Sequence, residues 1–224
     1  MRFNLTIPDP AVMRVGKEAY VSIASGTELH RIHSATYKAE QFNPSTLGNA
    51  RFSPILNAHG AVIPTIYAAE TFACATCEII LRNPDTPPVD PKTGRPTFQI
   101  VYPADFKAHC HSVIRTRTDL NLVDLTNAGQ RKIGVSHNAL LAGPRSTYSA
   151  TRAWAEHIHA MCPNAHGIYY SSVQYGPDFA IVLFGDRTGS EIFDAVTTRS
   201  VADPICHAEI RSIADGLSID YEDV

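Results

Sequence analysis

The chain has 224 residues, of which 44% are apolar and 18% are charged, and its formal net charge at pH 7 is −3. A chain of this length and apolar content can bury a large core, which excludes a disordered or fibrous protein and predicts one globular domain with room for an added lobe. The 19 basic side chains do not exceed the 22 acidic ones, so nothing favours the phosphate backbone of a nucleic acid as a direct partner.

The N-terminal residues and the cysteines indicate the compartment. The first residues, MRFNLTIPDPAV, contain no apolar run followed by a small-residue cleavage site, and no stretch of the chain has the apolar length of a membrane span. The five cysteines lie in apolar segments, which suits reduced thiols that act as small hydrophobic residues. We therefore expect a cytoplasmic protein without a membrane partner.

The first predicted elements lie in the N-terminal third of the chain. Residues 28–34 (ELHRIHS) alternate between polar and apolar, as in a half-buried strand that would carry Arg31. Residues 41–57 are rich in Asn, Pro, Ser and Gly and predict a loop with a short extended piece at 51–53. Residues 61–67 (AVIPTIY) predict a strand, and the proline within it indicates a sheet edge or a bulge.

A helix is predicted to follow this strand and to reach Leu81, because apolar residues recur there at spacings of three and four. Residues 84–96 contain five prolines, too many for a helix or an inner strand, and predict an exposed excursion. The remaining predicted strands cover 98–102, 110–115, 121–125, 167–172 and 179–184, and the remaining predicted helices cover 146–162 and 203–216. Because strands and helices interleave without a strict βαβ rhythm, the pattern favours an α+β fold over a doubly wound parallel sheet.

Several familiar chemistries leave no trace in the sequence. Neither the Walker glycine spacing nor the Rossmann glycine spacing occurs, so a nucleotide would have to be held by other means. A GxSxG elbow is also missing, which weakens a serine-hydrolase interpretation. Cys74 and Cys77 have the CxxC spacing, and residues 109–111 (HCH) add further metal-ligand types. The cysteine pair lies in an apolar helical pattern, so we expect core thiols and no metal site.

Four side chains between Leu29 and Glu78 have the chemistry of one site. The guanidinium groups of Arg31 and Arg51 match phosphate oxygens, Tyr67 offers an aromatic face or a hydroxyl, and the Glu78 carboxylate can stabilise a cation. Taken singly, each has a plainer interpretation: surface salt bridges for the two arginines, a core aromatic residue for Tyr67 and a solvated helix residue for Glu78.

The segments LHRIHS, ARFSP, PTIYAAETFACATCE, RAWAEHIHA and HGIYYSSVQ, in this order, resemble the RES domain, a family named after an arginine, a glutamate and a serine. The resemblance covers residues 29–184 and implies a compact α+β, mixed-sheet fold similar to that of ADP-ribosyltransferase toxins. Residues 1–28 would then form an N-terminal extension. Residues 185–224 would form a C-terminal extension packed on the same domain, which would also carry the excursion at 84–96.

The activity that the resemblance implies is cleavage of the nicotinamide–ribose bond of NAD⁺ by hydrolysis or phosphorolysis. Inorganic phosphate would be the co-substrate in the second case, and no metal or further cofactor is implied. Arg31 and Arg51 match the two family arginines and would hold the diphosphate. Tyr67 would pack on the nicotinamide ribose or ring, and Glu78 would stabilise the positive charge that develops on that ribose.

The family serine matches Ser172 best, where it would bind the ribose or Glu78. Ser171 is adjacent, and a slip by one residue would turn the side chain to the other face of the strand. The second arginine motif departs from the common pattern, because Ser53 stands where many members have an asparagine.

The resemblance also implies a partner, since many relatives are the toxin of a toxin–antitoxin pair and are neutralised by a helix-turn-helix antitoxin. The extensions and the excursion leave the usual pairing open here, and the sequence leaves the oligomeric state open as well. Two alternatives to NAD⁺ degradation stay in view. One is transfer of ADP-ribose to another protein, and the other is a catalytically inactive NAD-binding or interaction module.

Overall fold

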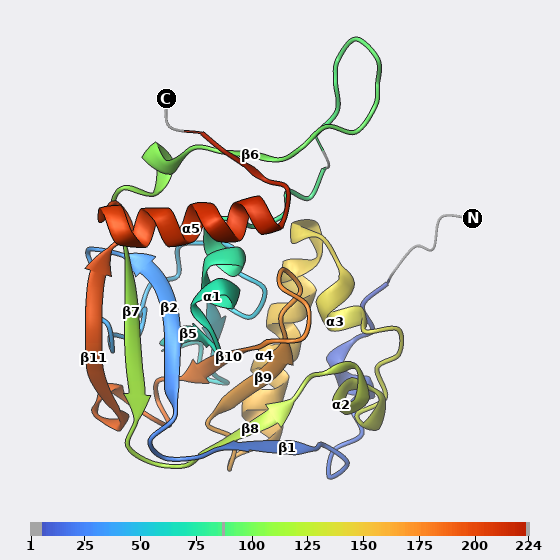
Figure 1. Cartoon of the computed structure of the whole chain (residues 1–224). Coiled ribbons are helices and arrows are strands. Elements are labelled where there is room, and N and C mark those ends of the chain that lie inside the picture. Colours follow the sequence, from blue (N-terminus) through green and yellow to red (C-terminus); the bar gives the residue numbers. More distant parts are fainter. Residues whose placement is uncertain (1–5, 87, 223–224) are drawn as a thin grey trace.

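One mixed sheet of eight strands organises the structure, a computed structural model that describes residues 6–86 and 88–222 (Figure 1). From edge to edge the strands are β1 (Tyr20–Ile23), β8 (Leu120–Asp124), β9 (Gly167–Ser171), β10 (Phe179–Phe184), β5 (Thr65–Ala69), β2 (Glu28–Ser34), β7 (His109–Thr116) and β11 (Phe193–Ser200). All neighbours are antiparallel except β8 and β9, which are parallel. The mixed sheet with its helices confirms the predicted α+β class.

Five α-helices occur in the described part of the chain: α1 (Phe72–Ile79), α2 (Asn127–Lys132), α3 (Ala139–Ala142), α4 (Tyr148–Met161) and α5 (Pro204–Gly216). The short remaining elements are the 3-10 turns η1 (Pro10–Val12), η2 (Pro103–Phe106), η3 (Arg145–Thr147) and η4 (Ser190–Ile192), and the strand pairs β3 (Ile55–Leu56) with β4 (Val62–Ile63) and β6 (Ile100–Val101) with β12 (Asp220–Tyr221). None of the described helices has the length and hydropathy of a membrane span.

Strand β10 shows how the core is divided by the sheet. Val182 and Phe184 belong to a cluster that includes Trp154 of α4 and residues of α1 and α5, whereas Ile181 and Leu183 belong to a second cluster. Neighbouring residues of a strand face opposite sides of the sheet, so β10 is buried on both faces. This burial explains why its sequence, FAIVLF, is apolar throughout rather than alternating.

Helix α1 follows the strand as predicted but ends at Ile79, two residues before the predicted end at Leu81, and one side chain sets its start at Phe72. Thr71 has an extended backbone, and its hydroxyl accepts a hydrogen bond from the Cys74 N–H at 3.1 Å. The same hydroxyl donates to a carboxylate oxygen of Asp178 at 2.5 Å, which ties the helix to the turn between β9 and β10. Thr71 is therefore an N-cap that also anchors the helix carrying Glu78.

Replacing Thr71 by alanine should lower the free energy of unfolding by about 1 kcal/mol, as is typical for the loss of an N-cap side chain. Thr71→Ser keeps the hydroxyl and should recover most of this loss. Equilibrium urea unfolding of both variants measures the difference. Equal stability of Thr71→Ala and the parent would show that the cap does not stabilise α1.

Pro64 has a different place from the one predicted. Strand β5 lies between β10 and β2 in the middle of the sheet, not at an edge. Pro64 precedes β5 and separates it from β4, so its missing N–H removes no hydrogen bond from the ladder of the large sheet. Its carbonyl instead accepts a hydrogen bond from the Gly185 N–H at 2.7 Å.

The proline-rich excursion at 84–96 extends away from the sheet as a long green loop in Figure 1. Its described residues form neither helix nor strand, and Val89 and Pro96 meet in an isolated bridge. The prediction of a non-regular segment is confirmed for this described part, and residue 87 lies outside it.

The feature that positions the site is a fork between β2 and β5. Strand β2 pairs with β7 along its full length, but it pairs with β5 only where His30 meets Ala69. Beyond this pair the two strands diverge, and the backbone groups that would have formed a ladder border a gap. The loop at 41–53 and helix α1 complete the walls around it.

Candidate active site

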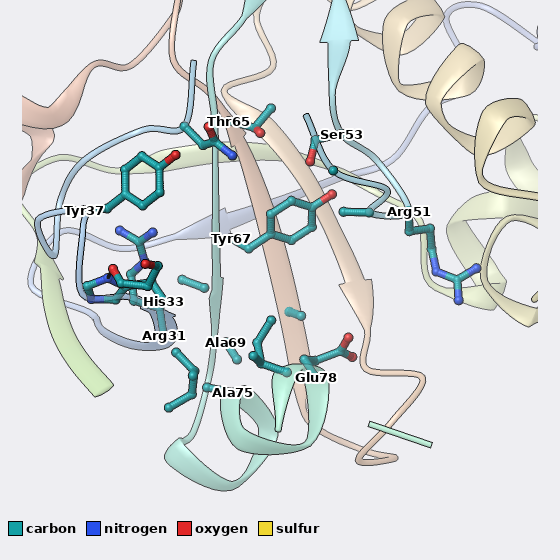
Figure 2. Close-up of a pocket in the computed structure, with 18 of the residues that line it drawn as sticks. Arg31, His33, Tyr37, Arg51, Ser53, Thr65, Tyr67, Ala69, Ala75 and Glu78 are labelled. Atoms are coloured by element: carbon teal, nitrogen blue, oxygen red, sulfur yellow. Dashed lines mark hydrogen bonds between the residues drawn. The ribbon is translucent and has the colours of Figure 1, made fainter. Parts of the chain in front are cut away.

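A cavity of about 300 Å³ occupies the fork between β2 and β5. Most of its wall comes from strand β2, the loop at 41–53, strand β5 and helix α1 with Arg82 behind it, and Tyr37, Tyr170 of β9 and Ala180 of β10 also line it. Arg31, Tyr67 and Glu78, three of the residues selected from the sequence, stand around this space in Figure 2. The topology therefore brings residues from separate segments to one concave site of ligand size.

Arg31 is a buried cation without a carboxylate partner in the described part of the chain. It is 8% exposed, and its Nη1 donates to the backbone carbonyl oxygens of Lys38, Ala39 and Gln41. Its Nε is buried and has no hydrogen-bond partner among the described residues. Burial lowers the pKa of the guanidinium to about 10, an effect that the charge of Glu40 partly offsets. Arg31 thus stays charged at neutral pH and forms no ion pair with the described residues.

Tyr67 presents its ring to the centre of the cavity (Figure 2). Its hydroxyl accepts a hydrogen bond from the Phe52 N–H at 3.0 Å, which ties β5 to the loop that carries Arg51. Burial raises the pKa of the phenol to about 12, so the side chain is neutral at physiological pH. A fixed, uncharged ring of this kind can stack on a planar or sugar ring.

Glu78 lines the cavity from helix α1, and Ser172 holds it in place. The Ser172 hydroxyl donates to Oε1 of Glu78 at 2.7 Å. The direction of this bond follows from the other two contacts of the hydroxyl oxygen, which accepts from the N–H groups of Gln174 and Tyr175 at 3.2 and 3.0 Å. With both lone pairs engaged, the hydroxyl proton is directed to Glu78. The second carboxylate oxygen, Oε2, has no hydrogen-bond partner among the described residues and can face a ligand.

Between the two serines considered from the sequence, Ser172 has the contact with Glu78. It is buried just after β9 and lies behind the carboxylate, not on the cavity wall. Ser171 is the last residue of β9. The geometry supports a positioning role for Ser172, and direct contact with a ribose stays a prediction.

Ser172→Ala should lower kcat of the proposed reaction about tenfold and change KM little, because the bond removed orients one charged oxygen. Ser171→Ala is the matched control and should keep kcat within about twofold of the parent. Steady-state kinetics of both variants, with circular dichroism to check folding, provide the measurement. A larger loss in Ser171→Ala than in Ser172→Ala would contradict this assignment.

The structure does not bring the guanidinium groups of Arg31 and Arg51 together, although both were expected to hold one diphosphate. Arg51 contributes to the cavity wall, but its guanidinium points away from Tyr67 in Figure 2. Its Nη1 donates to the carbonyl oxygens of Leu140 and Gly143 at 3.3 and 3.2 Å, and its Cζ lies 4.8 Å from the centre of the Tyr148 ring. The physical reason is that a ring and two carbonyl groups satisfy this cation on the far side of the loop.

Two further cavity residues were not selected from the sequence. Arg82 lines the cavity from just beyond the end of α1, and its Nη2 donates to the hydroxyl of Tyr148. His30 lines the cavity beside Arg31. Arg82 follows both the predicted and the observed helix, so helical spacing from Glu78 gave no signal for it. His30 fitted the alternation of a strand and gave no separate signal.

The CxxC pair behaves as core thiols. Cys74 and Cys77 are buried in α1, and burial raises the pKa of each thiol to about 12. Among the described residues no group of three or more His, Cys, Asp or Glu side chains is placed to hold a metal ion.

Together these features define an α+β protein whose forked sheet borders a cavity with a buried cation, an aromatic ring and an anchored carboxylate. The chain belongs to the RES domain family, whose model matches residues 28–204. The match begins one residue before the expected segment and ends 20 residues beyond it, so it includes the edge strand β11.

A similar fold occurs in a chain of the M. tuberculosis MbcT–MbcA toxin–antitoxin complex. The TM-score is 0.60, the sequence identity is 15%, and the alignment covers 92% of this chain and 100% of that chain. No curated protein matches the sequence.

Proposed function

We propose that this protein is the toxin of a toxin–antitoxin pair and that it degrades NAD⁺ by cleaving the bond between nicotinamide and ribose. The observation that carries the proposal is the presence of two opposite charges in one cavity: Arg31, a buried cation that forms no ion pair with the described residues, and Glu78, a carboxylate anchored by Ser172. Membership of the RES family and the fold shared with a chain of a toxin–antitoxin complex support it.

Arg31 would bind the diphosphate of NAD⁺. Arg31 lines the cavity, and its Nη2 has no hydrogen-bond partner among the described residues, so this nitrogen supplies donor hydrogens for a phosphate oxygen. Tyr67 would pack against the nicotinamide ribose or ring. Because Arg51 is satisfied by Tyr148 and two carbonyl groups, its part is to hold the loop that forms the opposite wall.

Glu78 would act on the sugar. When the C–N bond breaks, its electron pair moves to the nicotinamide nitrogen, which loses its positive charge, and the ribose becomes an oxocarbenium-like cation. The free Oε2 of Glu78 would stabilise this cation while Ser172 keeps the carboxylate in one orientation. Water attack then forms a C–O bond, gives ADP-ribose and releases a proton. Attack by inorganic phosphate gives the 1″-phosphate instead.

Chromatography of NAD⁺ incubated with the purified protein, with and without phosphate, tests the reaction. Nicotinamide release with ADP-ribose as the second product indicates hydrolysis, and a phosphate-dependent product indicates phosphorolysis. Mass added to a co-incubated protein would instead indicate ADP-ribosyl transfer. Intact NAD⁺ in the presence of folded protein and both nucleophiles would overturn the proposal.

The proposed partner is an antitoxin, for which a helix-turn-helix protein from a neighbouring reading frame is the candidate. Expression of the parent chain alone should arrest growth and deplete cellular NAD⁺, and co-expression of the antitoxin should prevent both. Growth arrest without NAD⁺ loss would separate the toxin role from the proposed chemistry.

A further inference from the structure

A chain of hydrogen bonds leads from the cavity wall to the edge strand β11. Nδ1 of His30 lies 3.0 Å from Nε2 of His111 on the neighbouring strand β7. The two rings are nearly coplanar, at 3°, with centroids 5.3 Å apart, as expected when two imidazoles meet edge to edge through a hydrogen bond. On the far side, Nε of Arg199 donates to Nδ1 of His111 at 3.1 Å.

The sequence of donors and acceptors in this series of hydrogen bonds determines which ring nitrogen carries each proton. An arginine can only donate, so Nδ1 of His111 accepts and carries no proton. In neutral His111 the proton is therefore on Nε2, which donates to Nδ1 of His30. Neutral His30 must then carry its own proton on Nε2. That nitrogen has no hydrogen-bond partner among the described residues, and His30 lines the cavity.

We propose that His30 is an additional ligand-binding residue whose Nε2–H donates to an acceptor oxygen of NAD⁺ in the cavity, while His111 and Arg199 are positioning residues that fix its tautomer. The inference rests on the proposed function for the identity of the ligand. The tautomer of the free protein follows from the hydrogen-bond chain alone.

The surroundings keep both histidines neutral. Burial and the charge of Arg199 lower the pKa of His111 to about 3. The ring of Phe72 covers His111 with centroids 4.4 Å apart, and Arg199 is held by Glu209. Burial also lowers the pKa of His30, with Glu28 acting against this shift and Arg199 adding to it. At neutral pH His30 is therefore a fixed donor at Nε2, not a proton acceptor.

The binding test uses calorimetric titration of NAD⁺ into Glu78→Gln protein, in which turnover is suppressed. In that background, His30→Leu should raise Kd about five- to tenfold through the loss of one hydrogen bond. His30→Gln places an amide N–H near the position of Nε2 and should stay within about threefold. His30→Asn places its amide near Nδ1 and should resemble His30→Leu, which keeps the comparison valid if the leucine variant does not fold.

The inference would be overturned if the Kd for NAD⁺ were the same with His30, His30→Asn and His30→Gln in folded Glu78→Gln protein. Absence of NAD⁺ binding to the Glu78→Gln protein would overturn it too. If the His30 variants differed in Kd as expected but the protein with Glu78 did not turn over NAD⁺, only the proposed reaction would be overturned.

Long-range ¹H–¹⁵N spectra of the free parent protein test the positioning role. The spectra should show the Nε2–H tautomer for both His30 and His111, with assignments from the His30→Gln and His111→Phe variants. Arg199→Met removes the donor that fixes the chain and should shift His30 towards a tautomer mixture. If the parent spectrum showed the proton of His30 on Nδ1, the assigned donors and acceptors of this hydrogen-bond series would be wrong.

Discussion

Glu78→Gln should lower kcat for NAD⁺ cleavage by about 10²- to 10³-fold and leave KM close to the parent value. The substitution keeps the size and shape of the side chain but removes the charge. Because Ser172 can donate to an amide oxygen as it does to a carboxylate, the anchored orientation should persist. The variant therefore separates charge from position, which an alanine substitution would not do.

The size of this effect follows from when the charge is needed. In bound NAD⁺ the positive charge is on the nicotinamide ring, and it moves to the ribose only as the bond breaks. A carboxylate beside the ribose thus stabilises the transition state more than the ground state, so its loss acts on kcat rather than on binding. The position of Glu78 in the wall of a concave cavity strengthens the interaction, because charges are screened less there than in open water.

Glu70→Gln is a matched control for this substitution. Glu70 is exposed, precedes the same helix and lies outside the cavity. We expect its activity to stay within about twofold of the parent in the same chromatographic assay. Turnover of folded Glu78→Gln at the parent rate would remove the central step of the proposed mechanism.

Elements with a strong local pattern could be predicted from the sequence. Strands β2 and β10 begin and end at the predicted residues, since alternation in one case and a continuous apolar run in the other mark their burial. Helix α5 begins after Asp203, whose side chain accepts hydrogen bonds from the N–H groups of Ile205 and Cys206. Here the cap itself is visible in the sequence as Asp-Pro.

The edges of the sheet could not be predicted in the same way. Strand β11 is exposed along most of its length, so its residues, FDAVTTRS, show no apolar alternation. Strand β1 has four residues, too few for a periodic signal. Both owe their place to pairing with partners far along the chain, β7 and β8. Such pairing depends on the tertiary fold rather than on local preference.

For the candidate site, too, some features could be predicted from the sequence and others depended on the tertiary fold. Backbone placement of Arg31, Tyr67 and Glu78 around one cavity agrees with the constellation selected from the sequence. The direction of the Arg51 guanidinium could not be foreseen, because a long side chain with several rotamers turns to whichever partner the fold supplies. The partner of Arg51 is Tyr148, which is distant in sequence and carries no motif.

Arg31→Lys should weaken NAD⁺ binding by about 10- to 100-fold, although the positive charge is kept. The lysine ammonium can take over contacts to the carbonyl oxygens at 38–41, but it has no second terminal nitrogen and no planar fork for phosphate oxygens. Hydrogen bonds between charged groups are worth about 1.5–3 kcal/mol, which gives the expected range. Titration of NAD⁺ into the Glu78→Gln protein with and without Arg31→Lys measures the change.

Arg51→Lys makes this test specific, because the two arginines differ in what their guanidinium groups contact. The lysine would lose the second carbonyl contact and the stacking on Tyr148, so we expect a loss of about 1–2 kcal/mol in the free energy of unfolding. Its Kd for NAD⁺ should stay within about threefold of the Arg51 parent in the same background. If the two variants weakened binding equally, Arg51 would have to turn into the cavity when the ligand binds, and the division of roles between a binding arginine and a loop-holding arginine would be wrong.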